Sequence, residues 1–389
     1  TPPLEMVVRD RVEVGGQPFR VFFSDRESQE SLLVLNARGY ISKVDLDTRE
    51  VVAQSARLRT GVMDAVVSPD GTRMLTWYTG GSKLFVIDTA TLDVLARVKC
   101  GKNLGRGLFT ADGSMALVSA VHSRRVCIVD LQSFDVIQRI PFPKAIGHIS
   151  LHPNGTIASA SAGIFSQGSK RSAPRGSHIF LFDPRPDHNP SVLEAGSLVS
   201  GRHPRGSMFT TEGQWLVTAN RLSGDLSITH VERGMVTEVA TSGRGVEAIV
   251  ALNDSGRFAG INRHDTHISV YQAQLENVTF EGNIYLSGAP FQLAPFTDAP
   301  FALATILGST IHIPATNWFK GSAYNVTYIK GQPVEHARYT HGLALIDLET
   351  MREVDFIKVG EGPMDVAIHP KGHMAAVACA RQRSVDIVF

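Results

Sequence analysis

The sequence has little cysteine, and this shortage excludes two kinds of scaffold. Only Cys100, Cys127 and Cys379 occur among its 389 residues. An odd number of cysteines without paired spacing provides neither a disulfide framework nor a CxxC or CxxCH motif. Each cysteine lies in or beside an apolar run of the kind that forms β-strands, and free cysteine is commonly buried. We therefore expect three buried core thiols.

An excess of charge of either sign is also missing. The chain contains 38 Lys and Arg residues against 37 Asp and Glu residues, so its formal net charge is +1. This balance argues against a broad surface for nucleic acid or anionic membrane, although a local basic patch stays open. No window approaches the roughly 18 apolar residues that a membrane-spanning helix needs. With 43% hydrophobic residues, the composition predicts a globular chain and excludes a disordered or collagen-like one.

The motifs of common enzyme classes are absent as well. The chain contains no GxSxG, no HExxH, no GxxxxGK[ST], and no GxGxxG between a strand and a helix. Among its fourteen histidines, His148 and His152 are four apart on a predicted strand, a separation of about 13 Å. His264 and His267, at a predicted hairpin turn, have no clear third ligand. We therefore predict no catalytic residue, no metal site and no cofactor.

What the chain does contain is an internal repeat, the first feature to establish in any sequence. Residues 60–100 and 360–388 both show a strand, a turn of the form Pro-Asp-Gly or Pro-Lys-Gly, a second strand, a polar turn and a third strand. The residues that close successive third strands are separated by 43, 42, 53, 47, 42, 75 and 42 positions. Those residues are Asp45, Asp88, Asp130, Asp183, His230, Gln272, Asp347 and Phe389. Where the residue is Asp, its carboxylate is expected to accept backbone N–H groups of the following turn.

A modal unit of 42 residues is four short strands with tight turns, which predicts an all-β, single-domain β-propeller over residues 1–389. We count eight blades, with seven as the alternative because of the 75-residue spacing. The eighth unit ends after three strands, and residues 4–14 resemble the missing fourth strand. Since an open ring would leave unpaired strand edges, we predict that the N-terminal strand pairs with the C-terminal blade.

The repeats DAVVSPDGTRMLTWYTGGSKLFVIDTATLDVLARV and DVAIHPKGHMAAVACARQRSVDIV resemble those of the YVTN-type β-propeller family. The repeat style is similar to that of cytochrome-d1-type eight-bladed propellers. The construction is also WD40-like, but no Trp-Asp dipeptide closes a third strand. Because the YVTN-type group includes surface-layer and periplasmic proteins, the resemblance implies a periplasmic or extracellular location. It specifies blades and no chemistry.

In propellers the first strand of each blade surrounds the central channel, whose entrance is the usual binding face. Aligning the units on the Gly of the first hairpin turn selects one position of each first strand, and polar residues dominate it. Their charges alternate in sign over part of the line. Two interpretations stay open: a polar channel mouth that orients a small ligand, or ion pairs between neighbouring blades. The line consists of Arg20, Asp64, Arg106, His148, Gly206, Ile249, Gln292 and Asp365.

Two insertions interrupt the repeat, at 164–178 in the fourth unit and at 314–342 in the seventh. Long loops in compact domains are often functional, and exposed aromatic and Arg residues anchor protein interfaces. An extra hairpin covering apolar surface is the alternative. We predict that the insertions bind a partner through Lys170, Arg171, Arg175, Trp318, Phe319, Lys320, Tyr324, Tyr328, Arg338 and Tyr339.

These observations favour a non-catalytic propeller that serves as a protein-binding scaffold or as a subunit of a larger assembly. A protein partner is expected, a small-molecule ligand at the channel mouth stays open, and nucleic acid is not expected. The alternative is an enzyme or cofactor-binding propeller with its site at the channel mouth. A lactonase-like hydrolase would use carboxylates there, for which Asp64 and Asp365 are candidates by position. A haem or copper oxidoreductase subunit would need a histidine, and His148 is the one on the line.

Overall fold

The computed structural model describes residues 6–26, 29–58, 61–78, 80–162, 177–186, 192–253, 255–308 and 341–389. The chain divides into two compact units. Unit 1 comprises Thr1–Val62, Ile261–Val270 and Glu281–Phe389, and unit 2 comprises Met63–Gly260 and Tyr271–Phe280. The expectation of a single domain stays a prediction.

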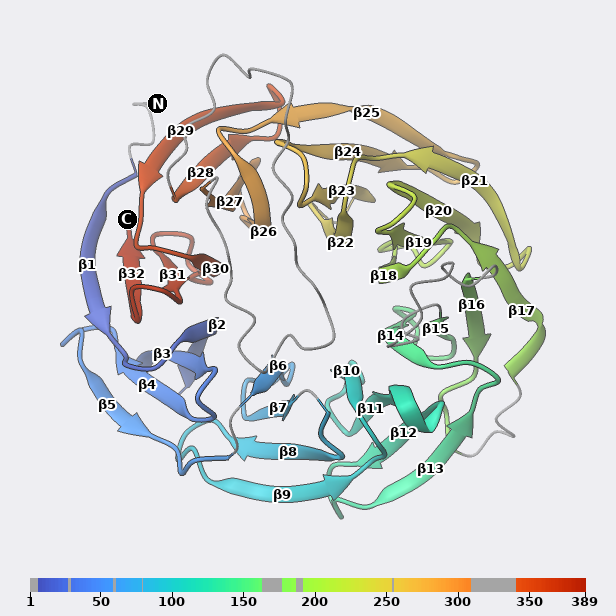
Figure 1. Ribbon diagram of the computed structural model, residues 1–389, viewed down its shortest axis with the longest axis horizontal. Coiled ribbons are helices and arrows are strands. Elements are labelled where there is room, and N and C mark those ends of the chain that lie inside the picture. Colours follow the sequence, from blue (N-terminus) through green and yellow to red (C-terminus); the bar gives the residue numbers. More distant parts are fainter. Residues whose placement is uncertain are drawn as a thin grey trace, which may run out of the picture. The chain divides into compact units, whose positions relative to one another are not determined.

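The described residues form eight four-stranded sheets (Figure 1), with essentially no helix. The first four sheets follow in chain order. The first consists of β2 (Pro18–Arg26), β3 (Gln29–Asn36), β4 (Ile41–Asp45) and β5 (Val51–Gln54), and the second of β6 (Val62–Val67), β7 (Arg73–Tyr78), β8 (Lys83–Asp88) and β9 (Val94–Lys99). The third consists of β10 (Leu104–Phe109), β11 (Met115–Ala120), β12 (Arg125–Asp130) and β13 (Val136–Pro141), and the fourth of β14 (Ile146–Leu151), β15 (Ala158–Ala162), β16 (Ser177–Phe182) and β17 (Val192–Ser200).

The remaining sheets repeat this construction. The fifth consists of β18 (Pro204–Phe209), β19 (Trp215–Asn220), β20 (Asp225–His230) and β21 (Met235–Thr241), and the sixth of β22 (Val246–Ala251), β23 (Arg257–Asn262), β24 (His267–Ala273) and β25 (Val278–Tyr285). The seventh consists of β26 (Ala289–Pro295), β27 (Phe301–Leu307), β28 (Gly342–Asp347) and β29 (Arg352–Lys358), and the eighth of β30 (Pro363–Ile368), β31 (Ala375–Cys379), β32 (Ser384–Val388) and β1 (Val8–Glu13).

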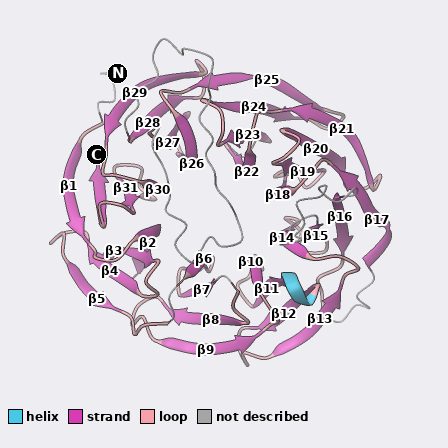
Figure 2. Ribbon diagram, in the orientation of Figure 1, coloured by secondary structure: helices cyan, strands magenta, loops and turns pink. Residues whose placement is uncertain are grey.

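Eight four-stranded sheets of one repeated construction are the blades of a β-propeller, as the repeat predicts, and the count is eight rather than seven. Figure 2 shows strands throughout, with the three-residue helix η1 (Val121–Ser123) between β11 and β12. Across the described residues, no helix has the length and apolar character needed to cross a membrane.

The middle strands of each blade are buried on both faces, and their sequences explain why. In β11 the residues Ala116–Ala120 are buried on both sides of the strand, whereas the outermost strand β13 alternates between exposed and covered positions. A strand covered on both faces needs a nearly continuous apolar run, and an outer strand needs only alternation. In unit 2, one apolar cluster joins the second and third blades and includes Trp77, Val86 and Val118. All three cysteines are buried, as predicted.

The Asp residues that close third strands hold the turns that follow, which confirms the reason predicted for their recurrence. Oδ1 of Asp45 accepts the N–H groups of Asp47 and Thr48 at 3.0 and 2.7 Å. Asp130 accepts those of Gln132 and Ser133 in the same way. The N–H of Ser133 lowers the pKa of Asp130, because these hydrogen bonds favour the charged carboxylate.

The N-terminal strand completes the C-terminal blade, as predicted. β1 pairs antiparallel with β32, and Val12 lies opposite Val385. The side chain of Asp386 is fully buried there and accepts two hydrogen bonds from Arg11, at 2.7 and 2.8 Å. It also accepts the N–H of Gly360 at 2.8 Å. A buried carboxylate needs such partners, so the pairing of the two chain ends satisfies Asp386 as well as the strand edge.

Candidate ligand-binding site

Most of the polar line occupies one structural position, the third residue of each first strand. Arg106 is the third residue of β10, His148 of β14 and Asp365 of β30. Each of these first strands pairs with the second strand of its blade. The register of that pairing shifts at a β-bulge that lies at this residue or directly before it. Bulges redirect a side chain and interrupt the ladder of backbone hydrogen bonds. Side-chain hydroxyls replace the lost backbone acceptors at this point. The N–H of Arg106 donates to the hydroxyl of Ser119, and the N–H of Gln292 donates to that of Thr305.

In the sixth blade the predicted position is wrong by one residue. The aligned residue lies four before the residue that opens the hairpin turn, as Arg106 does before Thr110 and Gln292 before Phe296, so the equivalent residue before Leu252 is Ala248, not Ile249. The alignment used the Gly of the first hairpin turn, which donates its N–H three residues back in the third blade, from Gly113 to Thr110. In the sixth blade the turn begins at Leu252 and its Gly, Gly256, comes four residues later. A displaced turn glycine therefore shifted the register of the sequence alignment.

The charged members of the line form ion pairs within each unit. In unit 1, Nη1 of Arg20 lies 3.4 Å from Oδ1 of Asp365, whose Oδ2 accepts the N–H of Val21 at 3.0 Å. In unit 2, Nη1 of Arg106 lies 2.9 Å from Oδ2 of Asp64. Each pair joins the first strands of neighbouring blades. The interpretation of alternating signs as interblade ion pairs thus agrees with these contacts, and both carboxylates considered for acid or base chemistry are engaged in them.

His148 is held neutral by burial and by two nearby arginines. Burial, followed by the positive charges of Arg106 and Arg205, lowers the pKa of His148 from its ordinary value of 6.5 to about 3. Its Nδ1 lies 3.2 Å from the hydroxyl of Ser207 on β18. That hydroxyl is in turn within 3.3 Å of Ser150 and Ser159. The serine network fixes the orientation of a neutral imidazole.

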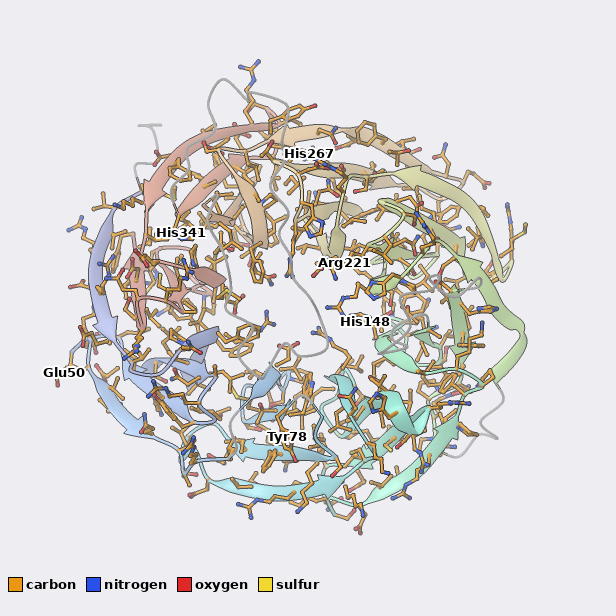
Figure 3. All side chains as sticks on the ribbon, in the orientation of Figure 1. Glu50, Tyr78, His148, Arg221, His267 and His341 are labelled. Atoms are coloured by element: carbon orange, nitrogen blue, oxygen red, sulfur yellow. The ribbon has the colours of Figure 1, made fainter. Side chains whose placement is uncertain are left out.

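A second histidine lies in similar surroundings one blade further along. Burial lowers the pKa of His203 to about 4, the positive charges of Arg205 and Arg221 add to the effect, and Glu247 opposes it. Nε of Arg221 lies 2.7 Å from Oε1 of Glu247, and the two side chains are 12% and 4% exposed. In Figure 3, His148 and Arg221 lie near the first strands of the fourth and fifth blades. We call Arg106, His148, His203, Arg205, Arg221 and Glu247 the Arg–His cluster.

The Arg–His cluster brings three guanidinium groups close to two imidazoles. Arg106 forms an ion pair with Asp64, and Arg221 forms one with Glu247. Both imidazoles are neutral near pH 7, because their pKa values are about 3 and about 4. The guanidinium groups lie among partly buried groups, where charge interactions are stronger than in water. Such surroundings suit an anionic ligand.

Sequence reasoning found two members of the cluster, Arg106 and His148. It missed Arg205 and Glu247, which are the second residues of β18 and β22, and Arg221, which follows the end of β19. Arg205 and Glu247 could have been found from the sequence, because each lies next to the third residue of its first strand. Arg221 comes from a different turn, and only the three-dimensional structure brings it to Glu247.

The insertion residues predicted to bind a partner lie outside the described residues. Within the part of the chain that the structure describes, no group of three or more His, Cys, Asp or Glu side chains is arranged to hold a metal ion. The predicted partner-binding residues that lie outside the described part are Lys170, Arg171, Arg175, Trp318, Phe319, Lys320, Tyr324, Tyr328, Arg338 and Tyr339.

Comparison with known proteins supports the fold. No family model and no curated protein matches the sequence. Among solved structures, the chain is similar to the C-terminal WD40 domain of Sif2, with 12% identity over 98% of this chain and 99% of that one and a TM-score of 0.67. It is also similar to the dihydro-haem d1 dehydrogenase NirN in complex with DHE, with 15% identity, 98% and 77% coverage and a TM-score of 0.66. Hydrazine synthase of Kuenenia stuttgartiensis follows with 14% identity, 97% and 96% coverage and a TM-score of 0.55. WD40 propellers and enzyme-associated propellers therefore share this fold.

The low pKa of His148 predicts a pH-dependent loss of stability. The unfolded chain binds a proton at this histidine below its ordinary pKa of 6.5, whereas the folded chain does so only near pH 3. The free energy of unfolding therefore falls as the pH drops below 6.5, by up to about 1.4 kcal/mol per pH unit from this group. Urea unfolding at pH 7 and pH 5 measures the loss, which should be smaller in His148→Gln. An equal loss in both proteins would contradict the assignment.

Proposed function

We propose that this protein binds an anionic small molecule through the Arg–His cluster. The observation that carries the proposal is that three arginines, Arg106, Arg205 and Arg221, lie close to two neutral histidines. Convergent polar groups of this kind fix the orientation of a ligand in a pocket. Guanidinium groups bind carboxylates through paired N–H donors, so a ligand with carboxylate groups suits the cluster best.

The neutral imidazole of His148 narrows the choice of ligand. A protonated imidazole is a pure donor, whereas a neutral one has one nitrogen that accepts a hydrogen bond or ligates a metal. The hydrogen bond between Nδ1 and the hydroxyl of Ser207 holds the imidazole ring in one orientation. A haem-type ligand would match both features, because the arginines would bind its carboxylates and the oriented imidazole would ligate its iron. A propeller of the same fold, NirN, is complexed with DHE. Such a ligand would supply redox chemistry, while the chain would bind and orient it.

Titration with hemin tests the proposal, with visible absorbance as the readout. Wild-type protein should shift the Soret band, and Arg205→Gln should weaken binding by about tenfold, a typical loss for one charged hydrogen bond. His148→Gln should alter the spectrum of the bound iron. Arg97→Gln, which removes an exposed cation from β9, is the matched control and should leave binding unchanged. Binding that is the same in wild type, Arg205→Gln and Arg106→Gln would contradict the proposal.

A second proposal concerns a protein partner. The likeness to WD40 propellers and the aromatic and basic composition of the 314–342 insertion favour a scaffold that docks through this segment. Trp318, Phe319, Tyr324 and Arg338 are the proposed anchors. Membership of the YVTN-type repeat family is part of the same proposal and rests on the repeats alone.

Deletion of residues 316–340 tests the docking proposal. The shortened chain should keep its far-ultraviolet circular dichroism and lose its partner in a pull-down from the source cells, followed by mass spectrometry. The Arg97→Gln variant again serves as the control. An intact fold with the same partners retained would contradict the docking role of the insertion.

A further inference from the structure

A basic cavity lies between the second and third blades of unit 2, apart from the Arg–His cluster. Its volume is about 640 Å³. The linker from β9 to β10 lies along it, together with the turns β7–β8 and β11–β12, the last residue of β9 and the first residue of β12. The lining consists of Gly80, Ser82, Lys99, Gly101, Lys102, Asn103, His122, Ser123 and Arg125.

The charge of this cavity has one sign. Lys99, Lys102 and Arg125 contribute three positive charges, and none of the lining residues is acidic. Within the described part of the chain, the ammonium groups of Lys99 and Lys102 form no ion pair with a carboxylate, and Nε of Arg125 donates to the carbonyl of Ser123 at 3.3 Å. Like charges placed together repel one another, so the three cations raise the energy of the protein until an anion joins them.

Hydrogen bonds fix the backbone of the cavity in advance. The N–H of Lys102 donates to the hydroxyl of Ser123 at 2.8 Å, and the N–H of Gly80 donates to the side chain of Asn103 at 2.9 Å. The N–H of His122 donates to the carbonyl of Lys102 at 3.1 Å. The linker is thereby joined to both turns, and little order has to be gained when a ligand binds.

Gly101 is required in this linker by its surroundings. Its φ is +151°, and a Cβ there would lie 2.6 Å from Cβ of Ala120 and 2.9 Å from the hydroxyl oxygen of Ser123. Glycine therefore lets the linker pack closely against the β11–β12 turn, which places Lys102 beside Ser123. Since Gly80 and Gly101 also carry no side chain, the floor of the cavity presents backbone and hydroxyl groups.

The lining indicates the chemistry of the ligand. Apart from His122, the lining residues include no aromatic side chain and no Val, Leu, Ile or Met on which a base or a hydrophobic ring could stack. Three cations, two hydroxyl groups and glycine backbone are the groups that bind phosphate oxygens. A volume of about 640 Å³ lies in the range of small-molecule sites and exceeds the size of one orthophosphate ion.

The position of Lys102 holds a cation in the following blades of unit 2 as well. The residue equivalent to Lys102, two before the first strand of the next blade, is Lys144 before β14, Arg202 before β18 and Arg244 before β22. In the eighth blade, in unit 1, the equivalent residue is Glu361. Unit 2 thus repeats a cation at this position, and the cavity at Lys102 also has Lys99 and Arg125.

We propose that the cavity lined by Lys99, Lys102 and Arg125 is a binding site for a compact molecule that carries two or more phosphate groups. Each phosphate contacts two cations, and the hydroxyl of Ser82 and the imidazole of His122 contribute further polar contacts. The site is independent of the proposed ligand of the Arg–His cluster.

Isothermal titration calorimetry of the full chain with inorganic pyrophosphate tests the site. Wild-type protein should bind pyrophosphate, and the double variant Lys102→Gln/Arg125→Gln should bind at least about tenfold more weakly, because two charge-assisted contacts are lost. Lys99→Glu, at an exposed position, should weaken binding as well. Thermal unfolding of each variant verifies that the fold is kept.

Three controls separate the outcomes. Lys358→Gln removes an exposed lysine from the equivalent end of β29, next to Glu361, and should leave pyrophosphate affinity unchanged. Arg205→Gln should also leave it unchanged, which distinguishes this site from the Arg–His cluster. Citrate, with carboxylates in place of phosphates, should bind more weakly. Absent binding, binding lost in Arg205→Gln but kept in the double variant, or equal affinity for citrate would overturn the proposal.

Discussion

The register between the first and second strands of each blade is the constraint on which the rest of the structure depends. A β-bulge in the first strand, just before or at its third residue, fixes which side chains meet those of the next blade. Hydroxyls of the second strand, such as Ser119 and Thr305, satisfy backbone N–H groups at this point. A shift of one residue would send each side chain to the opposite face. Interblade ion pairs, the Arg–His cluster and the neutral state of His148 all follow from that register.

The repeated blade construction holds polar groups in two different ways in different blades, one structural and one chemical. At Asp386 a buried carboxylate has three hydrogen-bond donors, two from Arg11 and one from Gly360, so its charge is satisfied where the chain ends pair. At His148 and His203 the surroundings are unbalanced, because positive charges and burial together disfavour protonation. Groups whose charge state is displaced by their surroundings are typical of functional sites, whereas fully satisfied groups are typical of structural ones.

The sequence predicted the fold because every blade repeats its local instructions. Short stretches of sequence were enough to recognise three features. These are the turn-forming Asp45 and Asp130, the apolar middle strands, and the fourth-strand character of residues 4–14. The site was predicted in part, through Arg106 and His148. Arg205, Arg221 and Glu247 were missed because their meeting depends on the packing of the fifth blade against the sixth. The one-residue error at Ile249 arose from the late glycine of its turn, Gly256, and no local signal corrects it.

The protonation of His148 tests most directly whether arginines surround a neutral imidazole. Nitrogen-15 NMR of histidine-labelled protein, with His148→Gln to assign the signal, reports the state of both ring nitrogens. We predict that His148 keeps the spectrum of a neutral imidazole down to about pH 4, since its pKa is about 3. Titration of His148 near its ordinary pKa of 6.5 would show that the ring is neither buried nor close to the charges of Arg106 and Arg205, and would contradict the geometry of the Arg–His cluster.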